Sequence, residues 1–364
     1  MIKFLLAKRV LLLNELTGKA ELIDPCGGKA TQASFPGRRS THAEEITMEF
    51  TTVHNGDITL NVAVKGAGPL ILCVHGWPEL WCSWRSQIDY FSSCGYKVAA
   101  MDVRGYGGSS RPWEIAAYSM QNLAGDVAAL IDQLGGGSAI LFGHDWGAPI
   151  VWNTALLHAS KVAAVAGLSV PYVPRGPVSA LELMEKAYAG RFFYQLYFQR
   201  EGVAEAELEA DIPDAIRKIF FACSGDAPLD SWLAEKPPTA GLLDGMIDPD
   251  PAPKWMSDGE LDLYIDAFRT GGFRGPLNRY RAQKIDFVEL SDYERRPITQ
   301  PSYFIGGERD PVRHFVPGRD LYENPGAACL DFRGSCIVPR VGHWLQQEAP
   351  DSTNAALADF LEQL

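Results

Sequence analysis

The sequence lacks a long apolar run and a paired-cysteine motif, and it has fewer basic than acidic residues. In 364 residues no stretch approaches the roughly 18 apolar residues of a membrane-spanning helix. The net charge of -12 opposes nucleic-acid binding. The seven cysteines are scattered without a CxxC pair, as reduced thiols are, and no cluster has metal-ligand spacing. We therefore expect a cytoplasmic protein with no membrane span, no nucleic-acid partner, no metal and no cofactor.

The composition indicates a globular protein with a large buried core. Hydrophobic residues make up 46% of the chain and charged residues 21%, which excludes a fibrous or disordered protein. Residues 1–44 lack clear periodicity and are interpreted as a lead that is partly disordered or not native. Lys8 and Arg9 interrupt the apolar run that a secretory signal at this end would need.

From residue 45 onward the hydrophobic pattern is that of an α/β protein. Asn55-Gly56 joins two strand-like segments and predicts a β-hairpin. Continuous apolar runs then alternate with helical stretches, which predicts a parallel sheet covered on both faces. The apolar runs are PLILCVHG, YKVAAMDVRG, SAILFGHD and KVAAVAGLSVP.

The alternation stops near Pro171. Residues 173–287 are helical and aromatic-rich, and include KAYAGRFFYQLYFQREG, before strand-like runs return at PSYFIGGERD and SCIVPRVGH. We therefore predict an α/β core made of residues 45–172 and 288–364. Its mostly parallel, twisted sheet is flanked by helices, and residues 173–287 form an inserted helical cap.

The run FGHDWGA predicts a sharp strand-to-helix turn that presents Asp145. Gly143 and Gly147 flank this aspartate where a tight turn crowds its neighbours. The alternative is that Asp145 only caps the following helix, since aspartate is a favoured N-cap. The chain order favours the first interpretation. Asp145, Asp310 and His343 each end a strand-like run, in the order nucleophile, acid, base.

An aspartate in that position is ionised at neutral pH and can attack a saturated carbon, which produces an alkyl ester. His343, oriented by Asp310, would then activate water against the ester carbonyl. The oxyanion hole would consist of the backbone N–H groups of Trp146, directly after the nucleophile, and of Trp77 in the HGWP loop.

Two reactions fit this machinery, the opening of an epoxide and the displacement of a halide. An epoxide oxygen leaves as an alkoxide and needs a neutral acid, for which Tyr194 and Tyr280 in the cap are candidates. Tyrosines in such places are ordinarily packing residues. A halide needs N–H donors, and the indoles of Trp77 and Trp146 could supply them. The residues by themselves leave both reactions open, together with a third class, a small-molecule binder without turnover.

Several motifs carry a family resemblance. From about Ile46 to Leu364 the chain resembles the soluble epoxide hydrolases of the α/β-hydrolase superfamily. The matching stretches are HGWPELWCSWRSQI, AMDVRGYGGSS, GHDWGAPIVWN, FYQLYFQREGVAEAELE, GFRGPLNRYR and VGHW. Haloalkane dehalogenases also carry the GHDWG motif, whereas the two cap motifs are more specific. Dehalogenases usually have Asn after the His-Gly pair where this chain has Trp77, which weakens that alternative.

The resemblance implies an α/β-hydrolase fold and conversion of an epoxide and water to a vicinal diol through a covalent alkyl-aspartyl ester. It implies Asp145 as nucleophile, His343 as general base and Asp310 as its acid partner. Tyr194 and Tyr280 are implied as donors to the epoxide oxygen. A haloalkane or haloacid dehalogenase with the same nucleophile is the alternative.

Aromatic residues near these positions favour an apolar or aryl-bearing epoxide as the substrate, with the protein a monomer or homodimer. The expected pocket residues are Trp77, Trp146, Phe192, Phe193 and Tyr197.

Three other polar residues near strand ends are expected to have structural roles. Asp102 is expected to shape a turn, and His144 to point into the elbow. His75 is expected to order the oxyanion loop through hydrogen bonds.

Overall fold

The structure is a computed structural model that describes residues 11–13, 20–22, 47–135, 137–229 and 231–364. The predicted lead lies outside the described residues, apart from two short antiparallel strands, β1 (Leu11–Leu13) and β2 (Ala20–Leu22). Among the described residues, no helix is both long and apolar enough to cross a membrane.

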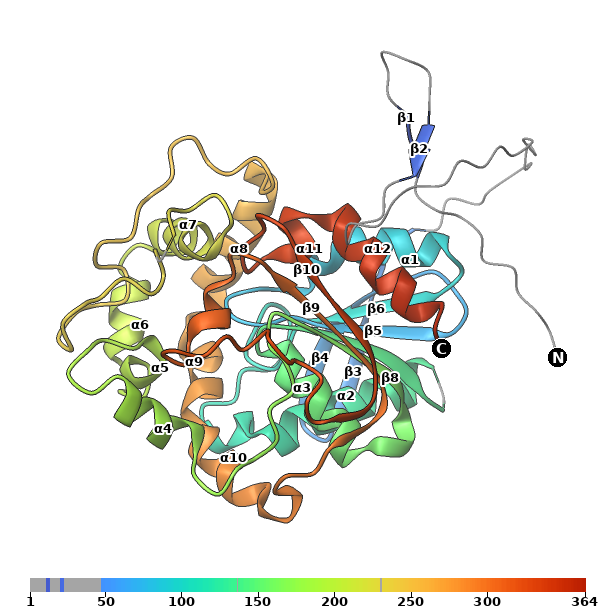
Figure 1. The fold of residues 1–364 in the computed structure, drawn as a ribbon, viewed down its shortest axis with the longest axis horizontal. Helices are drawn as coiled ribbons and strands as arrows, with labels where there is room; N and C mark the ends of the chain where they lie inside the picture. Colours follow the sequence, from blue (N-terminus) through green and yellow to red (C-terminus); the bar gives the residue numbers. More distant parts are fainter. Residues whose placement is uncertain (1–10, 14–19, 23–46, 136, 230) are drawn as a thin grey trace.

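An eight-stranded sheet forms the centre of the fold (Figure 1). Its spatial order is β10-β9-β8-β7-β5-β6-β4-β3, and the strands from β10 to β6 are parallel. Strands β4 and β3 extend it as an antiparallel edge. The mostly parallel sheet is therefore confirmed. The strands are β3 (Glu49–Asn55), β4 (Ile58–Lys65), β5 (Leu70–Val74), β6 (Lys97–Met101), β7 (Ala139–His144), β8 (Val162–Leu168), β9 (Ile298–Gly307) and β10 (Cys329–Val338).

Helices cover both faces of this sheet. In β5 the alternate side chains show why: Ile71 packs in a cluster with Phe91, whereas Leu72 packs on the opposite face in a cluster with Val127. The helices are α1 (Arg85–Ser93), α2 (Met120–Leu134), α3 (Gly147–Leu157), α4 (Ala180–Ala187), α5 (Tyr194–Tyr197), α6 (Val203–Leu208), α7 (Ile212–Cys223), α8 (Asp258–Gly271), α9 (Arg274–Arg281), α10 (Gln283–Glu289), α11 (Leu345–Glu348) and α12 (Pro350–Leu361).

The predicted hairpin forms with its turn displaced by one residue. Asn55 pairs with Ile58, so the two turn residues are Gly56 and Asp57. Gly56 has φ of 59°, a left-handed conformation that glycine adopts without a steric penalty. Glycine at the first turn position therefore sets the register.

The helices α4 to α10 lie between β8 and β9 in the chain, at the place predicted for the inserted cap, and Figure 1 shows them beside the sheet. The stretch KAYAGRFFYQLYFQREG is less helical than expected. Helix α4 ends at Ala187, and α5 begins only at Tyr194. The reason is a turn in which Arg191 N–H donates to the Tyr188 carbonyl, with Gly190 at φ of 76°. A left-handed residue ends an α-helix.

Candidate active site

The predicted elbow is present between β7 and α3. Asp145 has φ of 49°, a left-handed conformation that is strained for a residue with a side chain. The turn is so tight that a Cβ on Gly147 would lie 2.0 Å from the Val74 carbonyl oxygen. Asp145 does not cap α3, because the N-cap residue is Trp146 and no side chain caps that helix. The carboxylate is instead free to face the cavity.

Asp145 meets the other two predicted residues at the same edge of the sheet. Its Oδ2 lies 3.4 Å from Nε2 of His343, and Nδ1 of His343 lies 3.1 Å from Oδ1 of Asp310. Asp310 follows the end of β9, and His343 lies in the loop after β10. The carboxyl ends of parallel strands meet at one edge, so three segments far apart in the chain form one triad.

Two members of the triad, His343 and Asp310, have shifted pKa values. Burial by itself would lower the pKa of His343, but the charges of Asp310 and Asp145 and their hydrogen bonds raise it well above its usual range. Burial would likewise raise the pKa of Asp310, yet the His343 charge and three side-chain hydrogen bonds hold it below its usual value. The two shifts together favour an imidazolium on His343 paired with a carboxylate on Asp310.

The Trp77 backbone N–H donates to Oδ1 of Asp145 at 2.7 Å, which is the geometry expected of an oxyanion-hole donor. Trp146 is the N-cap residue of α3, and the first N–H groups of a helix have no partner within it. The Trp77 N–H therefore lies where a donor was predicted, and the Trp146 N–H stays a prediction.

The two predicted cap tyrosines reach the same place from different helices. Tyr194 begins α5 and Tyr280 lies near the end of α9, and their ring centroids are 5.8 Å apart. Burial raises the pKa of both phenols well above the usual value, so both remain protonated. The Trp146 side chain hydrogen-bonds to Tyr280, which lowers the pKa of that phenol by less than burial raises it. The pair can donate but is not ionised.

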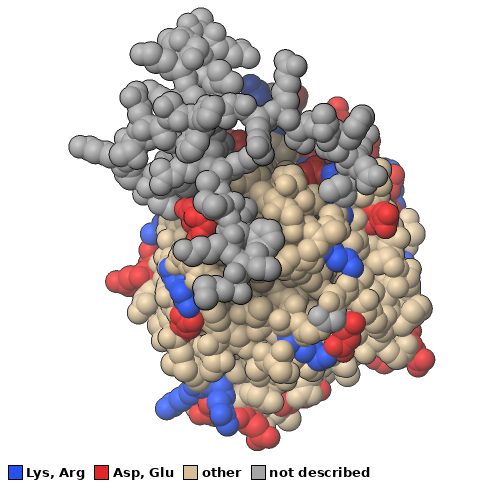
Figure 2. Space-filling view, turned by 90° about the vertical axis from the view of Figure 1, so that its right-hand side faces the viewer, with Lys and Arg blue, Asp and Glu red and all other residues tan. Residues whose placement is uncertain are grey.

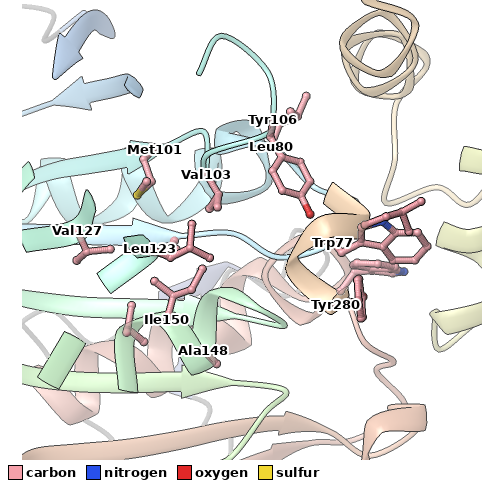
Figure 3. Close-up of a cluster of buried hydrophobic side chains, with 14 of the residues drawn as sticks. Trp77, Leu80, Met101, Val103, Tyr106, Leu123, Val127, Ala148, Ile150 and Tyr280 are labelled. Carbon is pink, nitrogen blue, oxygen red and sulfur yellow. The ribbon is translucent and has the colours of Figure 1, made fainter. Parts of the chain in front are cut away.

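A cavity of about 290 Å³ joins these groups. Figure 3 shows two of its residues, Trp77 and Tyr280, side by side at the end of the buried core cluster. The cavity contains the reactive groups of Asp145, His343, Tyr194 and Tyr280, and its aromatic walls are Trp77, Trp232, Phe315 and Trp344.

The other expected pocket residues lie beside this cavity or deeper in the cap, and Trp146 packs edge-on against Tyr280 at a centroid distance of 5.2 Å. Phe192, Phe193, Tyr197 and Trp146 are not among the residues that line this cavity. The Tyr197 hydroxyl donates to Glu207 within the cap at 2.7 Å. The short α5 explains the difference, because a single helical turn directs Tyr194 into the cavity while its neighbours pack against other cap residues.

Sequence reasoning missed two groups that hold Asp310. The Ser169 hydroxyl lies between Asp310 and Nδ1 of His343, 3.0 Å from the latter, and donates to Asp310. The Tyr322 hydroxyl lies 2.7 Å from Oδ2 of Asp310. Ser169 directly follows β8, so its position at a strand end was a usable signal. Tyr322 lies in an irregular segment, where no periodicity identifies it.

His75 and Asp102 have the structural roles expected of them. Nδ1 of His75 donates to the Gly76 carbonyl at 2.8 Å, and Nε2 accepts from the Val103 N–H at 2.9 Å, which orders the oxyanion loop. Asp102 accepts from the N–H of Gly108 at 2.9 Å and of Trp81 at 3.0 Å, so it shapes the turns on either side.

His144 lies directly beneath the triad, fully buried. Its Nε2–H donates to the His343 carbonyl oxygen at 2.8 Å, and Nδ1 is 2.7 Å from Oε2 of Glu79. Glu79 in turn accepts from the Gly76 N–H, so this buried pair ties the oxyanion loop to the backbone of the base. The role of Glu79 was not foreseen.

No metal-binding cluster of three or more His, Cys, Asp or Glu side chains occurs among the described residues.

Comparison with known proteins places this geometry in a family. A profile for the alpha/beta hydrolase fold matches residues 69–350. The chain is 41% identical to "Epoxide hydrolase A" of Mycobacterium tuberculosis over 318 residues, which are 85% of this chain and 96% of that protein. It is 36% identical to "Epoxide hydrolase" of Caballeronia sordidicola, with 86% and 93% of the two chains covered.

Solved structures agree. Epoxide hydrolase A from Mycobacterium thermoresistibile matches with a TM-score of 0.81 and 39% identity over 87% of this chain and 98% of that one. An epoxide hydrolase from an endophytic Streptomyces also gives 0.81, with 36% identity over 88% and 96%. With the elbow aspartate, its histidine and acid, and the two cap phenols all in place, this chain belongs to the epoxide hydrolases of the α/β-hydrolase fold.

Proposed function

We propose that the protein converts an apolar or aryl epoxide and water to a vicinal diol through an alkyl ester on Asp145. The observation that carries this proposal is the meeting of unlike groups in one cavity. A carboxylate paired with His343 at 3.4 Å faces two protonated phenols, Tyr194 and Tyr280. A nucleophile and a neutral acid in the wall of one small cavity suit the opening of an epoxide ring.

The two oxygens of Asp145 have different roles in this scheme. Oδ1 accepts the Trp77 N–H and becomes the carbonyl oxygen of the ester. Oδ2, which faces His343, forms the bond to an epoxide carbon as the carbon–oxygen bond of the ring breaks. The ring oxygen takes a proton from Tyr194 or Tyr280. The charge on that oxygen grows during bond breaking, which is where a fixed donor is most effective.

The second step depends on a change in charge. Alkylation converts the Asp145 carboxylate to a neutral ester and removes one of the charges that raise the pKa of His343. The imidazolium can then pass its proton to the phenolate left by ring opening, and the neutral imidazole accepts a proton from water. The resulting hydroxide attacks the ester carbonyl carbon, and the Trp77 N–H stabilises the charge on its oxygen. Collapse of the tetrahedral intermediate releases the diol and restores the carboxylate.

Halide displacement by the same nucleophile receives less support. A halide cradle requires free indole N–H donors. Among the described residues the Trp77 indole N–H, in the cavity wall, has no hydrogen-bond partner and could serve as one, but the Trp146 side chain is hydrogen-bonded to Tyr280. The two phenols line the same cavity, where they match a leaving group that needs a proton.

The direct test is turnover of styrene oxide compared with 1-chlorobutane, followed by mass spectrometry of the intact protein during turnover. We expect diol from styrene oxide, no halide release, and a transient protein species heavier by one substrate. Diol formation without any covalent species, even after rapid quenching, would exclude Asp145 as nucleophile.

Buried free thiols, such as Cys73 and Cys223, support a reducing compartment such as the cytoplasm. The face in Figure 2 shows the described Lys and Arg side chains in small groups beside acidic residues, which does not favour a nucleic-acid partner. We propose a monomer or homodimer, which sedimentation would distinguish.

A further inference from the structure

Glu348, the last residue of α11, makes an unusual set of contacts with the backbone. Its Oε2 accepts from the N–H of Gly342 at 3.0 Å and of Gly225 at 2.8 Å. Its Oε1 accepts from the N–H of Trp344 at 3.0 Å. Two of these donors flank His343 in the chain. The carboxylate therefore holds the loop of the catalytic base on both sides.

The third donor belongs to the cap. Gly225 follows α7, whose last residue, Cys223, accepts the His343 N–H at 2.8 Å. The two backbones touch: a Cβ on Gly342 would lie 2.3 Å from the Gly225 nitrogen. The end of α7 and the His343 loop thus form one hydrogen-bonded unit, which we call the cap–base clasp, and Glu348 is the carboxylate at its centre.

Burial disfavours the charged form of Glu348 in this position. Burial raises its pKa to about 7, and nearby Asp226 adds to that effect, although the three N–H donors favour the charged form. The donors are all backbone groups, so only the carboxylate can accept from the three of them together. A side chain with that arrangement determines where the backbone around His343 lies.

We propose that Glu348 is a positioning residue for the hydrolytic half-reaction, in which it fixes the His343 loop against the end of α7. This inference rests on the function proposed above. Hydrolysis requires His343 to be within reach of Asp310 and of water at the same time, and a displacement of about 1 Å can cost about 10²-fold in rate. Alkylation of Asp145 does not use His343 as a base, so it should be much less sensitive.

The test is Glu348→Gln, with alkylation and hydrolysis of the ester measured separately in single-turnover experiments. The amide keeps one acceptor oxygen but turns an NH₂ group toward a backbone N–H, which breaks the clasp on one side. We expect hydrolysis to slow about 10- to 100-fold, alkylation to stay within about threefold, and the alkyl-enzyme to accumulate.

A matched control is Glu207→Gln. Glu207 also accepts two backbone N–H groups, those of Leu242 and Leu243, each at 2.9 Å, but it lies within the cap and does not contact the His343 loop. This variant should lose thermal stability in the same way while the ratio of the two rate constants stays at the parent value.

Glu348→Asp provides the second variant, because the shorter side chain keeps the charge but cannot reach all three donors. It should also slow hydrolysis selectively, and it decides the question if the Gln variant does not fold. Equal slowing of both steps, or hydrolysis at the parent rate in a folded variant, would overturn the inference. A parent protein that forms no ester would instead refute the proposed function.

Discussion

The α/β core and the cap hold the side chains that line the cavity in different ways. In the core, Asp145 is fixed by a backbone at φ of 49° pressed against the next strand through Gly147. In the cap, Tyr194 packs its ring against neighbouring rings at centroid distances of 5.1–5.8 Å, and its hydroxyl accepts from Gln195. The core thus places its groups through the main chain, and the cap through side-chain packing.

This difference determines which changes are informative. A substitution in the core elbow changes the backbone or removes the reacting group. A Tyr→Phe change in the cap keeps the ring packing and removes only the hydroxyl, so it measures the donor alone.

The largest effect is expected from Asp145→Ala. Removal of the nucleophile should reduce turnover by at least about 10⁴-fold, because no other group in the cavity can form the ester. Thermal unfolding of the variant should remain cooperative. Steady-state diol formation measures the loss. A residual rate within about tenfold of the parent would contradict the assignment of Asp145 as the nucleophile.

His343→Gln should separate the two half-reactions. Hydrolysis of the alkyl ester should fall by about 10³–10⁴-fold, as for a triad without its base, whereas alkylation continues. Intact-protein mass spectrometry should then show a stable adduct of one substrate mass. An adduct-free protein that still consumes epoxide would show that water attacks the substrate directly.

The cap phenols should give a graded loss. Tyr194→Phe and Tyr280→Phe should each slow alkylation by up to about 10²–10³-fold, the value of one donor aimed at developing charge. Because both donate to one oxygen, the double variant should lose more than either single variant. Rapid-quench measurement of ester formation tests this. Alkylation by the double variant at nearly the parent rate would show that the two tyrosines only pack in the cap and do not donate to the epoxide oxygen.

Two glycines in the first turns of helices allow the core and the cap to be compared by the free energy of unfolding alone. Gly147→Ala would place a Cβ 2.0 Å from the Val74 carbonyl and should destabilise by about 1–3 kcal/mol or more. Gly259 in the first turn of α8 has open space, so Gly259→Ala should stabilise by about 0.4–1 kcal/mol. Urea unfolding measures the free energy of unfolding of both variants. Equal changes in the two would contradict the difference in backbone packing between the core and the cap.

The smallest effect concerns pH. Although burial opposes it, the carboxylates of Asp310 and Asp145 raise the pKa of His343 above 6.5 in the folded state. Its contribution to stability is therefore fully present below the unfolded pKa and is lost as the pH rises through the folded value. The free energy of unfolding of His343→Gln should fall less steeply above about pH 7 than that of the parent. Parallel slopes would contradict the raised pKa.

Much of the core could be predicted from local sequence patterns. Continuous apolar runs identified the parallel strands, and the glycines around Asp145 identified the elbow, because both are consequences of a few neighbouring residues. The exception was the hairpin turn, where Gly56 rather than Asn55 occupies the first turn position.

The cap was harder to predict for a physical reason. Its helices are short and its aromatic residues are buried on several sides, so helical periodicity does not show which ring faces the cavity. Phe192 and Phe193 are neighbours of Tyr194 in sequence, yet only Tyr194 lines the cavity, whereas Trp232 and Phe315 reach it from distant segments.

The sequence by itself determined the strand order along the chain, the elbow, and the three strand-end residues Asp145, Asp310 and His343 that meet in the structure, because those depend on local backbone geometry and on residue chemistry. Only the tertiary structure decided which residues support them. Ser169 and Tyr322 at Asp310, Glu79 beneath the elbow and Glu348 at the His343 loop come from segments far apart in the chain. Hydrogen bonds between such segments exist only after the sheet has brought the strand ends together.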